Sequence, residues 1–266
     1  MSYSTLLPVN LKEAPEDLSK LIAFIKKFGT KKIILIHNLA DSSIKKDEAE
    51  NKLQEFKTEL SKSDVDCEYH LVNGELPVEV NRLMAELEID FITLNWRPKN
   101  AIKRTVMGSL DSDILRLCDY PIFIYKHHGF FGETKNLEKV LYATDLSDPD
   151  ARYQKYLDIL GKTAEKLYIL HVRERAPDPL TDEKRLEETN DRIAQKSRYC
   201  QTYFRQTEEI VAVGSTRKEI ARQASRNGIN LIVIGKQGSK SAKSKVLGAT
   251  AEDIPHRTNS CIFIIP

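Results

Sequence analysis

The sequence predicts an α/β protein of two tandem domains, each a doubly wound, five-stranded and mainly parallel sheet with helices on both faces. Two observations lead to this prediction. Short apolar runs alternate with amphipathic stretches along the chain, a pattern typical of parallel strands connected by helices. The same succession then occurs twice, and a chain of 266 residues is long enough for two domains with separate cores.

The repeat is visible residue by residue near the end of each copy. Residues 89–126 align without a gap on residues 229–266, at a constant spacing of 140. Identical pairs include Ile92/Ile232, Val106/Val246, Gly108/Gly248 and Asp113/Asp253. Upstream the spacing falls to 134, as between His37 and His171, so the second copy carries about six extra residues around 173–198. Twofold repetition of one α/β unit is therefore the main structural prediction.

Each copy is expected to alternate strands and helices. In the first copy the expected strands are 3–9, 32–37, 65–72, 89–94 and 122–125, and the expected helices are 15–28, 45–61, 77–87 and 108–118. In the second copy the expected strands are 139–144, 167–172, 209–213, 229–234 and 261–265. Its expected helices are 149–166, 181–204, 217–226 and a short one that begins at Gly248.

The helix expected over 181–204 is highly charged, with one apolar side. The apolar side consists of Leu186, Ile193, Ala194 and Tyr199, and the side expected to face water consists of Glu187, Glu188, Arg192 and Lys196. Glu188 and Arg192 are four residues apart and could form an ion pair. Burial of the apolar side is expected to dominate the stability of this helix.

The boundary between the copies falls in a segment without hydrophobic periodicity. Residues 127–136 read HHGFFGETKN, so we expect a domain at 1–127, a linker at 128–136 and a second domain at 137–266. The last strands of the two copies are equivalent, and a bare sheet edge invites pairing. We expect these strands to pair in an internal pseudo-dimer, so that any further homodimer would use another surface.

Composition and charge exclude several classes of protein. The net charge is +2, without the strong basic bias typical of nucleic-acid binders. The longest apolar runs are about six residues, far shorter than a membrane span, and no secretory signal is readable. The scattered Cys67, Cys118, Cys200 and Cys261 favour buried, reduced thiols. We therefore expect a cytoplasmic protein without nucleic-acid or membrane partners.

The main candidate site is the glycine-containing loop after the strand 229–234. Residues 235–250 read GKQGSKSAKSKVLGAT, and a buried strand that ends in spaced glycines can deliver backbone amides to a phosphate. Gly235 and Gly238 permit positive φ and close approach of a ligand. Gly248 begins a helix whose N-terminus favours an anion. Lys236 and the later lysines of the loop could add positive charge or simply be solvated.

Two further loops are expected to meet the glycine loop. Ligands of open α/β sheets bind beyond the carboxyl ends of the strands, where the strand order reverses. Ala143, Thr144 and Asp145 follow one strand of the second copy, and Val172 ends another. Asp145 would accept hydrogen bonds from ribose hydroxyls or an adenine amine, and the backbone of Val172 would pair with a base edge. The alternative for Asp145 is to cap the following helix.

With these residues, the second copy resembles a universal stress protein domain. The resemblance rests on LEKVLYATDLSDPDA at 137–151, LYILHVRER at 167–175, LIVIGKQG at 231–238 and GAT at 248–250. The family pattern of Gly, two residues, Gly, nine residues, Gly is met at Gly235, Gly238 and Gly248. The resemblance implies a tandem member that binds ATP or another adenine nucleotide, with or without Mg²⁺, through these glycines, Asp145 and Val172.

The second copy departs from the family pattern after Gly248. Ala249 and Ala251 stand where ATP-binding members carry hydroxyl side chains, and Thr250 could substitute for one of them. A hydrogen bond to a charged group is typically worth about 1.5–3 kcal/mol, so a missing hydroxyl corresponds to roughly 10–100-fold in affinity. Pro255 is expected to kink or shorten the last helix because it has no N–H.

The first copy has lost most of the pattern. Asn10 stands in place of Asp145, and Asn95 and Pro98 replace the first two glycines, although Gly108 and Ser109 remain. Proline has a fixed φ and no amide hydrogen to offer a phosphate. We therefore expect the first copy to be degenerate as a nucleotide site.

Taken alone, the sequence favours a tandem universal stress protein that binds an adenine nucleotide in its second domain as a regulatory, stress-response module. A scaffold of the same fold that binds no nucleotide is the alternative, which the two alanines permit. Slow ATP hydrolysis is a weaker alternative, and no catalytic residue is assigned. The loop lacks the spacing of a Walker A motif, and no metal motif is present. His37 and His171 end equivalent strands and are expected to have packing roles.

Overall fold

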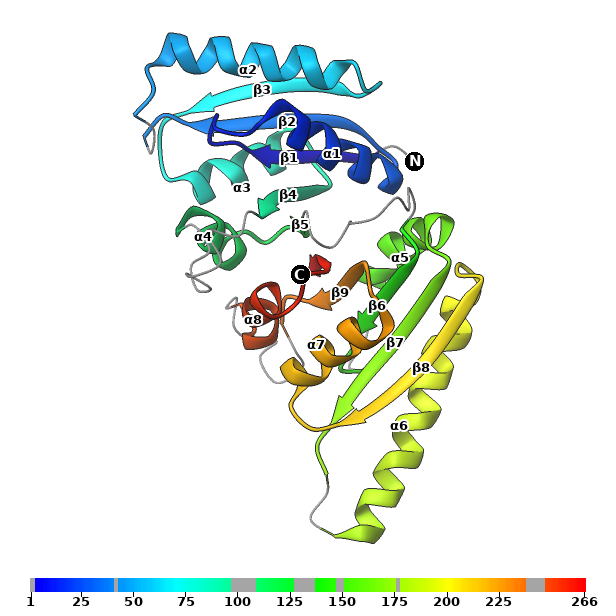
Figure 1. The fold of residues 1–266 in the computed structure, drawn as a ribbon. Helices are drawn as coiled ribbons and strands as arrows, with labels where there is room; N and C mark the ends of the chain where they lie inside the picture. Colours follow the sequence, from blue (N-terminus) through cyan, green and yellow to red (C-terminus); the bar gives the residue numbers. More distant parts are fainter. Residues whose placement is uncertain are drawn as a thin grey trace. The chain divides into compact units, whose positions relative to one another are not determined.

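The computed structural model describes residues 3–40, 43–96, 109–126, 137–146, 151–175, 178–237 and 247–266. The chain forms two compact units, Met1–Tyr125 and Lys126–Pro266. Each unit alternates strands and helices, which confirms the predicted α/β class and the tandem repeat (Figure 1). The expected linker 128–136 lies outside the described residues and stays a prediction.

The first unit contains five strands in the order β3-β2-β1-β4-β5. The strands are β1 (Tyr3–Pro8), β2 (Thr30–Asn38), β3 (Asp66–Val72), β4 (Phe91–Trp96) and β5 (Ile122–Lys126). The helices are α1 (Pro15–Ile25), the short 3₁₀ helix η1 (Lys26–Phe28), α2 (Lys46–Ser61), α3 (Leu76–Glu86) and α4 (Ser109–Leu117). β1 pairs in parallel with both β2 and β4, so the strand order reverses between β1 and β4.

The second unit repeats this topology in the order β10-β9-β6-β7-β8. Its strands are β6 (Lys139–Ala143), β7 (Lys166–Arg173), β8 (Gln206–Val213), β9 (Leu231–Gly235) and β10 (Cys261–Ile265). Its helices are α5 (Ala151–Thr163), α6 (Pro179–Cys200), α7 (Thr216–Asn227) and α8 (Ala249–Arg257). The order reverses between β6 and β9, which pair in parallel.

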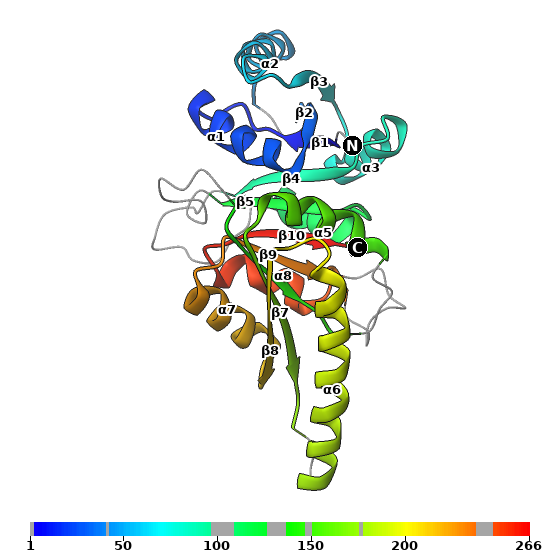
Figure 2. The same cartoon turned by 90° about the vertical axis from the view of Figure 1, so that its right-hand side faces the viewer.

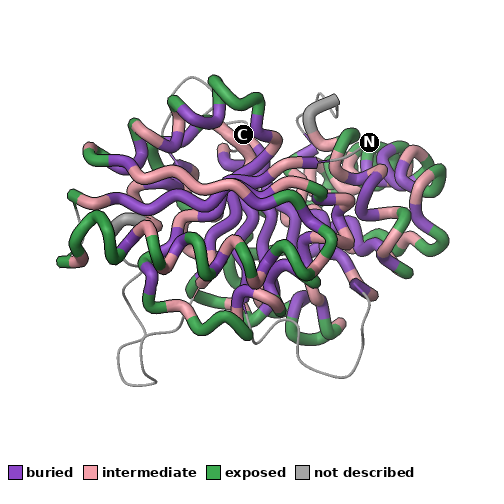
Figure 3. Tube along the Cα trace, turned by 90° about the horizontal axis from the view of Figure 1, so that it is seen from above, coloured by how far each residue is buried: buried purple, intermediate pink, exposed green. Residues whose placement is uncertain are grey.

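Burial follows from this layering. The central strands are largely buried because helices cover both faces of the sheet, as Figure 2 shows for α6 and α7 of the second unit. In Figure 3 the middle of the sheet is buried, whereas each helix alternates between buried and exposed turns. The outer strands β3 and β8 are mostly half-buried or exposed. All four cysteines are buried, as expected. No helix among the described residues is long and apolar enough to cross a bilayer.

The six extra residues of the second copy lie in α6. This helix has 22 residues, whereas its counterpart α2 has 16. It begins earlier than the sequence predicted because Asp178 caps it, accepting a hydrogen bond from the Thr181 amide at 2.9 Å. This bond lowers the pKa of Asp178, and Pro179 fits the first helical position, where no N–H is required.

Two expectations for helices need correction. Lys196 was expected to face water, but it is 5% exposed, and its Nζ lies 5.7 Å from the centroid of the Tyr142 ring. A lysine can be buried in this way because its aliphatic stem packs while its ammonium group faces an aromatic ring. Of the predicted apolar side, Ile193 is 1% exposed, whereas Leu186, Ala194 and Tyr199 are half-buried. Pro255 does not shorten α8, which continues to Arg257 and has nine residues, as α4 does.

Candidate functional site

The strand register of the second unit brings the predicted loops to one edge of the sheet. Ala143, the last residue of β6, is aligned with Leu170 of β7 and with Ile234 of β9. The chain therefore leaves these three strands at the same level. The predicted site residues that follow directly are Thr144, Asp145, Val172 and Gly235. This edge lies where the strand order reverses, the usual position of ligands in open α/β sheets.

The loop after β6 has an unusual and well-bonded conformation. The Thr144 amide donates to the Leu170 carbonyl at 2.9 Å, and the Thr144 hydroxyl accepts from the Leu146 amide at 3.0 Å. The buried Leu146 has a φ of 62°, a left-handed conformation that is rare for residues with a side chain. Asp145 is exposed and lies well before Ala151, where α5 begins, so it does not occupy the capping position of that helix.

His171 supports the same loop from β7. Its Nδ1 lies 2.9 Å from the Thr144 carbonyl, and the equivalent Nδ1 of His37 lies 2.8 Å from the Val9 carbonyl in the first unit. His37 is buried, whereas His171 is half-buried. Both histidines therefore orient the loop that follows the first strand of their unit, which agrees with the predicted packing roles.

Two glycines of the second unit are required by close approach rather than by positive φ. A Cβ on Gly235 would lie 2.6 Å from the Tyr153 hydroxyl and 3.0 Å from the Gln237 carbonyl. A Cβ on Gly248 would lie 2.9 Å from the Lys236 carbonyl, to which the Gly248 amide donates at 2.8 Å. Neither glycine has a positive φ, so the positive φ that a glycine permits is not used at Gly235. These contacts hold the two ends of the glycine loop together.

The remaining residues of this loop are only partly described. Gly238 and the later lysines lie outside the described residues. Lys236 is not the solvated or phosphate-facing lysine that the sequence suggested, because it is 2% exposed. Ala249 is exposed and Thr250 half-buried at the start of α8. The first amides of a helix have no intrahelical acceptor, so this end of α8 can donate hydrogen bonds to an anion.

In the first unit, the loop after β1 keeps the backbone conformation and has an amide in place of the carboxylate. Leu11 has a φ of 64°, matching the 62° of Leu146. The side-chain oxygen of Asn10 accepts from the Lys12 amide at 2.8 Å, and the Asn10 amide donates to Glu13 at 3.0 Å. Asn10 therefore forms a local turn, and its acceptor oxygen is already engaged.

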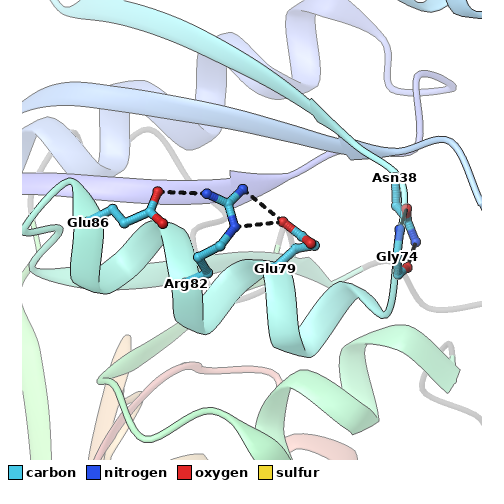
Figure 4. A network of polar contacts seen from close by, with 5 residues as sticks. All are labelled: Asn38, Gly74, Glu79, Arg82 and Glu86. Carbon is cyan, nitrogen blue, oxygen red and sulfur yellow. Dashed lines mark hydrogen bonds and ion pairs between the residues drawn. The ribbon is translucent and has the colours of Figure 1, made fainter.

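The other two positions of the first unit are altered as well. Asn38, the counterpart of Val172, donates from its side chain to the Gly74 carbonyl at 2.9 Å and accepts from the Gly74 amide at 3.3 Å (Figure 4). Asn95 stands in place of Gly235, and its buried side-chain amide has no hydrogen-bond partner among the described residues. Pro98 lies outside the described residues. At this edge of the first unit, the side chain of Asn38 is thus engaged within the unit.

Two contacts from α6 reach the candidate site, and sequence reasoning missed both. Arg192 donates to the Leu146 carbonyl. Arg173, which directly follows Val172, makes two hydrogen bonds to Asp182, at 2.5 and 3.1 Å. These bonds raise the pKa of the Arg173 guanidinium above its ordinary value. The signal in the sequence was the change in repeat spacing from 134 to 140, which marks α6 as altered.

Comparison with known proteins assigns the family. The model of the universal stress protein family matches residues 35–126 and 136–266, which is most of the chain and includes both units. The chain belongs to the universal stress protein family. The resemblance predicted from the sequence is therefore confirmed for both copies. No curated protein matches the chain in sequence.

Solved structures of this family share the tandem fold. A universal stress protein from Archaeoglobus fulgidus is 23% identical, with a TM-score of 0.70, over 98% of this chain and 95% of that one. A protein from Pseudomonas aeruginosa, provisionally assigned to the same family, is 17% identical with a TM-score of 0.70, over 99% and 92% of the two chains. At these identities the likeness supports the fold of this universal stress protein and nothing finer.

The described residues offer no obvious metal centre. No group of three or more histidine, cysteine, aspartate or glutamate side chains is placed to hold a metal ion within the described ranges. The polar groups at the sheet edge of the second unit are instead a carboxylate, backbone groups and a helix N-terminus. This combination suits an organic anion with hydroxyl or amine donors.

Proposed function

We propose that this universal stress protein binds one adenine nucleotide, ATP or AMP, in its second unit and acts as a regulatory module of the stress response. The observation that supports the proposal most directly is the register of β6, β7 and β9. It brings Asp145, Val172 and Gly235 to the edge where the strand order reverses. The spacing of the three glycines, which matches the family pattern, adds independent support.

Each part of the site would recognise one part of the nucleotide. The exposed carboxylate of Asp145 would accept hydrogen bonds from the ribose hydroxyls or the adenine amine. The backbone at Val172 would pair with an edge of the base. The amides of Ala249 and Thr250, at the N-terminus of α8, would donate to the phosphates, and Mg²⁺ would accompany the phosphates if it is needed. Gly235 and Gly248 allow the chain segments to approach closely enough for this arrangement.

The proposal assigns one nucleotide to each chain. In the first unit, the side chains of Asn10 and Asn38 form internal hydrogen bonds. Asn95 also adds a side chain at the position of Gly235, where the second unit tolerates none. The first unit is therefore proposed to contribute structure rather than a second nucleotide site.

Calorimetric titration of the whole chain with ATP and with AMP tests the proposal. We expect a stoichiometry of one and a loss of at least about tenfold in affinity for Gly248→Ala, because its Cβ would collide with a backbone carbonyl. The matched control is Gly74→Ala, whose Cβ would meet its nearest neighbour, Glu79, at an ordinary 3.4 Å. A stoichiometry of two, or full binding by Gly248→Ala, would contradict the proposal. Absence of binding at millimolar nucleotide would instead favour a scaffold.

The alanine after Gly248 provides a test in the opposite direction. Ala249→Ser restores the hydroxyl of the family pattern and is expected to tighten binding by about tenfold, since a hydrogen bond to a charged group is worth about 1.5–3 kcal/mol. The first unit already carries Ser109 at this position, and Ser109→Ala should leave binding unchanged. Tightening by Ala249→Ser alone would locate the phosphates in the second unit.

Two further expectations remain predictions. Pairing of the last strands in an internal pseudo-dimer is motivated by their equivalence in sequence, and independent tumbling of the two units in NMR relaxation would contradict it. Slow ATP hydrolysis has no assigned catalytic residue. Release of phosphate by the wild-type chain that persists in Gly248→Ala would indicate a contaminating activity rather than this site.

A further inference from the structure

We propose that α6 positions the nucleoside half of the site, through Arg192 acting on the loop after β6 and Asp182 acting on Arg173 at the end of β7. The proposal rests on the function proposed above for its ligand, although its structural part can be tested in the free protein. Neither arginine is proposed to touch the nucleotide. Both would act through the backbone that presents Asp145 and Val172.

The loop after β6 is tied to α6 by a side chain. Leu146 is buried in a left-handed conformation, which residues with a Cβ adopt unfavourably. Its amide is held by the Thr144 hydroxyl at 3.0 Å, and its carbonyl is held by the guanidinium of Arg192. Asp145 lies between Thr144 and Leu146, so these two bonds help to fix the backbone from which its side chain projects. The first of them is internal to the loop, and the second ties the loop to α6.

The end of β7 is held in a similar way. The side chain of Arg173 is 11% exposed and that of Asp182 is 24% exposed, so their paired hydrogen bonds are largely shielded from water. Two parallel bonds between a guanidinium and a carboxylate define both distance and orientation. The Arg173 carbonyl also accepts from the Gly214 amide at 3.2 Å. The backbone next to Val172 is therefore held from α6 on one side and from the β8–α7 loop on the other.

The first unit shows what the lengthening of α6 changes. Asp182 corresponds to Glu48 of α2 at the spacing of 134 that holds before the helix. Arg192 corresponds to Lys52 at the spacing of 140 that holds after it. Those two residues are four apart and pair with each other at 3.3 Å on the surface of α2. In α6 their counterparts are ten residues apart, about 15 Å along a helix, so they cannot pair with each other. Each reaches a different loop of the site instead.

The ligand test compares four variants of the whole chain by calorimetric titration with adenosine, AMP and ATP. Arg192→Gln and Asp182→Asn are each expected to weaken binding of all three by a similar factor of about tenfold, because the loss concerns the nucleoside that they share. Arg192→Lys keeps the charged donor and should recover most of the affinity. The matched control is Arg198→Gln, which removes the same charge from an exposed position of the same helix and should bind as the wild type does.

A second measurement needs no nucleotide. Hydrogen exchange of the Leu146 amide should accelerate about tenfold in Arg192→Gln and remain unchanged in Arg198→Gln, since only the first variant releases the loop. Faster exchange without nucleotide binding by the wild type would support the positioning role and refute the proposed function. Unchanged exchange in Arg192→Gln would overturn the inference, as would a loss confined to ATP, which would place Arg192 at the phosphates.

Discussion

The two units share their strand order, a histidine bonded to the loop after the first strand, and a left-handed leucine in that loop. They differ in what the polar side chains at the same sheet edge do. In the first unit the side chains of Asn10 and Asn38 bond to nearby backbone, whereas the second unit has a carboxylate at Asp145 and an apolar side chain at Val172 in their places. The backbone of the edge has thus been retained where the proposed binding chemistry has been lost.

The loop after the first strand has the same backbone conformation in both units, so this conformation belongs to the fold and not to the ligand site. Leu11 and Leu146 have φ values of 64° and 62°, although only one of them lies in a proposed nucleotide site. In both units a histidine Nδ1 contacts the carbonyl of the residue two positions before this leucine, at 2.8 Å in the first unit and 2.9 Å in the second. Backbone geometry can therefore survive in a unit whose side chains no longer match the family pattern.

The largest expected effect concerns the helices that differ most between the units. Ile193 of α6 and Leu53 of α2 are equivalent and buried, with exposures of 1% and 0%. Ile193→Asp and Leu53→Asp should each destabilise their own unit by about 4 kcal/mol, because each buries an unpaired charge. Hydrogen exchange measured separately for the peptides of each unit would show which unit opens.

The exposed Glu188 provides the control for this comparison. Glu188→Ala should change stability by less than about 0.5 kcal/mol, as is usual for surface substitutions. Arg192, its expected partner, is directed elsewhere, because the Arg192 guanidinium donates to the Leu146 carbonyl. Equal effects of Ile193→Asp and Glu188→Ala would show that α6 is not docked through its apolar side.

The order of strands and helices could be predicted because the same succession of apolar runs occurs in both copies of the sequence. The polar start of β8, at Gln206-Thr207-Glu208, was missed because β8 is an edge strand whose residues there are largely exposed. The start of α6 was missed because Pro179 was not recognised as a first helical residue behind an Asp178 cap. The rules for helix capping could have identified the start of α6. Hydrophobic periodicity could not have identified the polar start of β8.

The supports of the site could not be predicted from local pattern. Lys196 looked like a solvated charge, and its burial depends on the Tyr142 ring of another element. The sequence permitted a positive φ at Gly235, but the structure does not use it, and a Cβ there would lie 2.6 Å from the Tyr153 hydroxyl. Both outcomes depend on which elements meet in three dimensions, which periodicity and spacing do not report.

A smaller effect is expected from the two histidines. His37→Ala should destabilise the first unit by about 3 kcal/mol, because it removes a hydrogen bond and leaves a cavity in a buried site. His171→Ala should cost the second unit about 1–2 kcal/mol, because this side chain is only half-buried. The free energies of unfolding, obtained from hydrogen exchange of each unit, test the ranking. A larger cost for His171→Ala would mean that the loop beside Asp145 contributes more stability than its exposure suggests.

The smallest expected effect concerns a pair of equivalent surface arginines. Arg82 bonds to both Glu79 and Glu86, at 2.8 and 2.6 Å (Figure 4), whereas Arg222 bonds to Glu219 at 2.5 Å. The counterpart of Glu86 is Arg226, which cannot supply a second carboxylate.

Arg82→Gln should therefore lower the unfolding midpoint of the first unit by about 1–2 °C, and Arg222→Gln should lower that of the second unit by less. Because exposed ion pairs are screened, both shifts should shrink at about 1 M NaCl. A shift that is larger for Arg222→Gln, or that persists at high salt, would show that the two helices are not held by equivalent surface pairs.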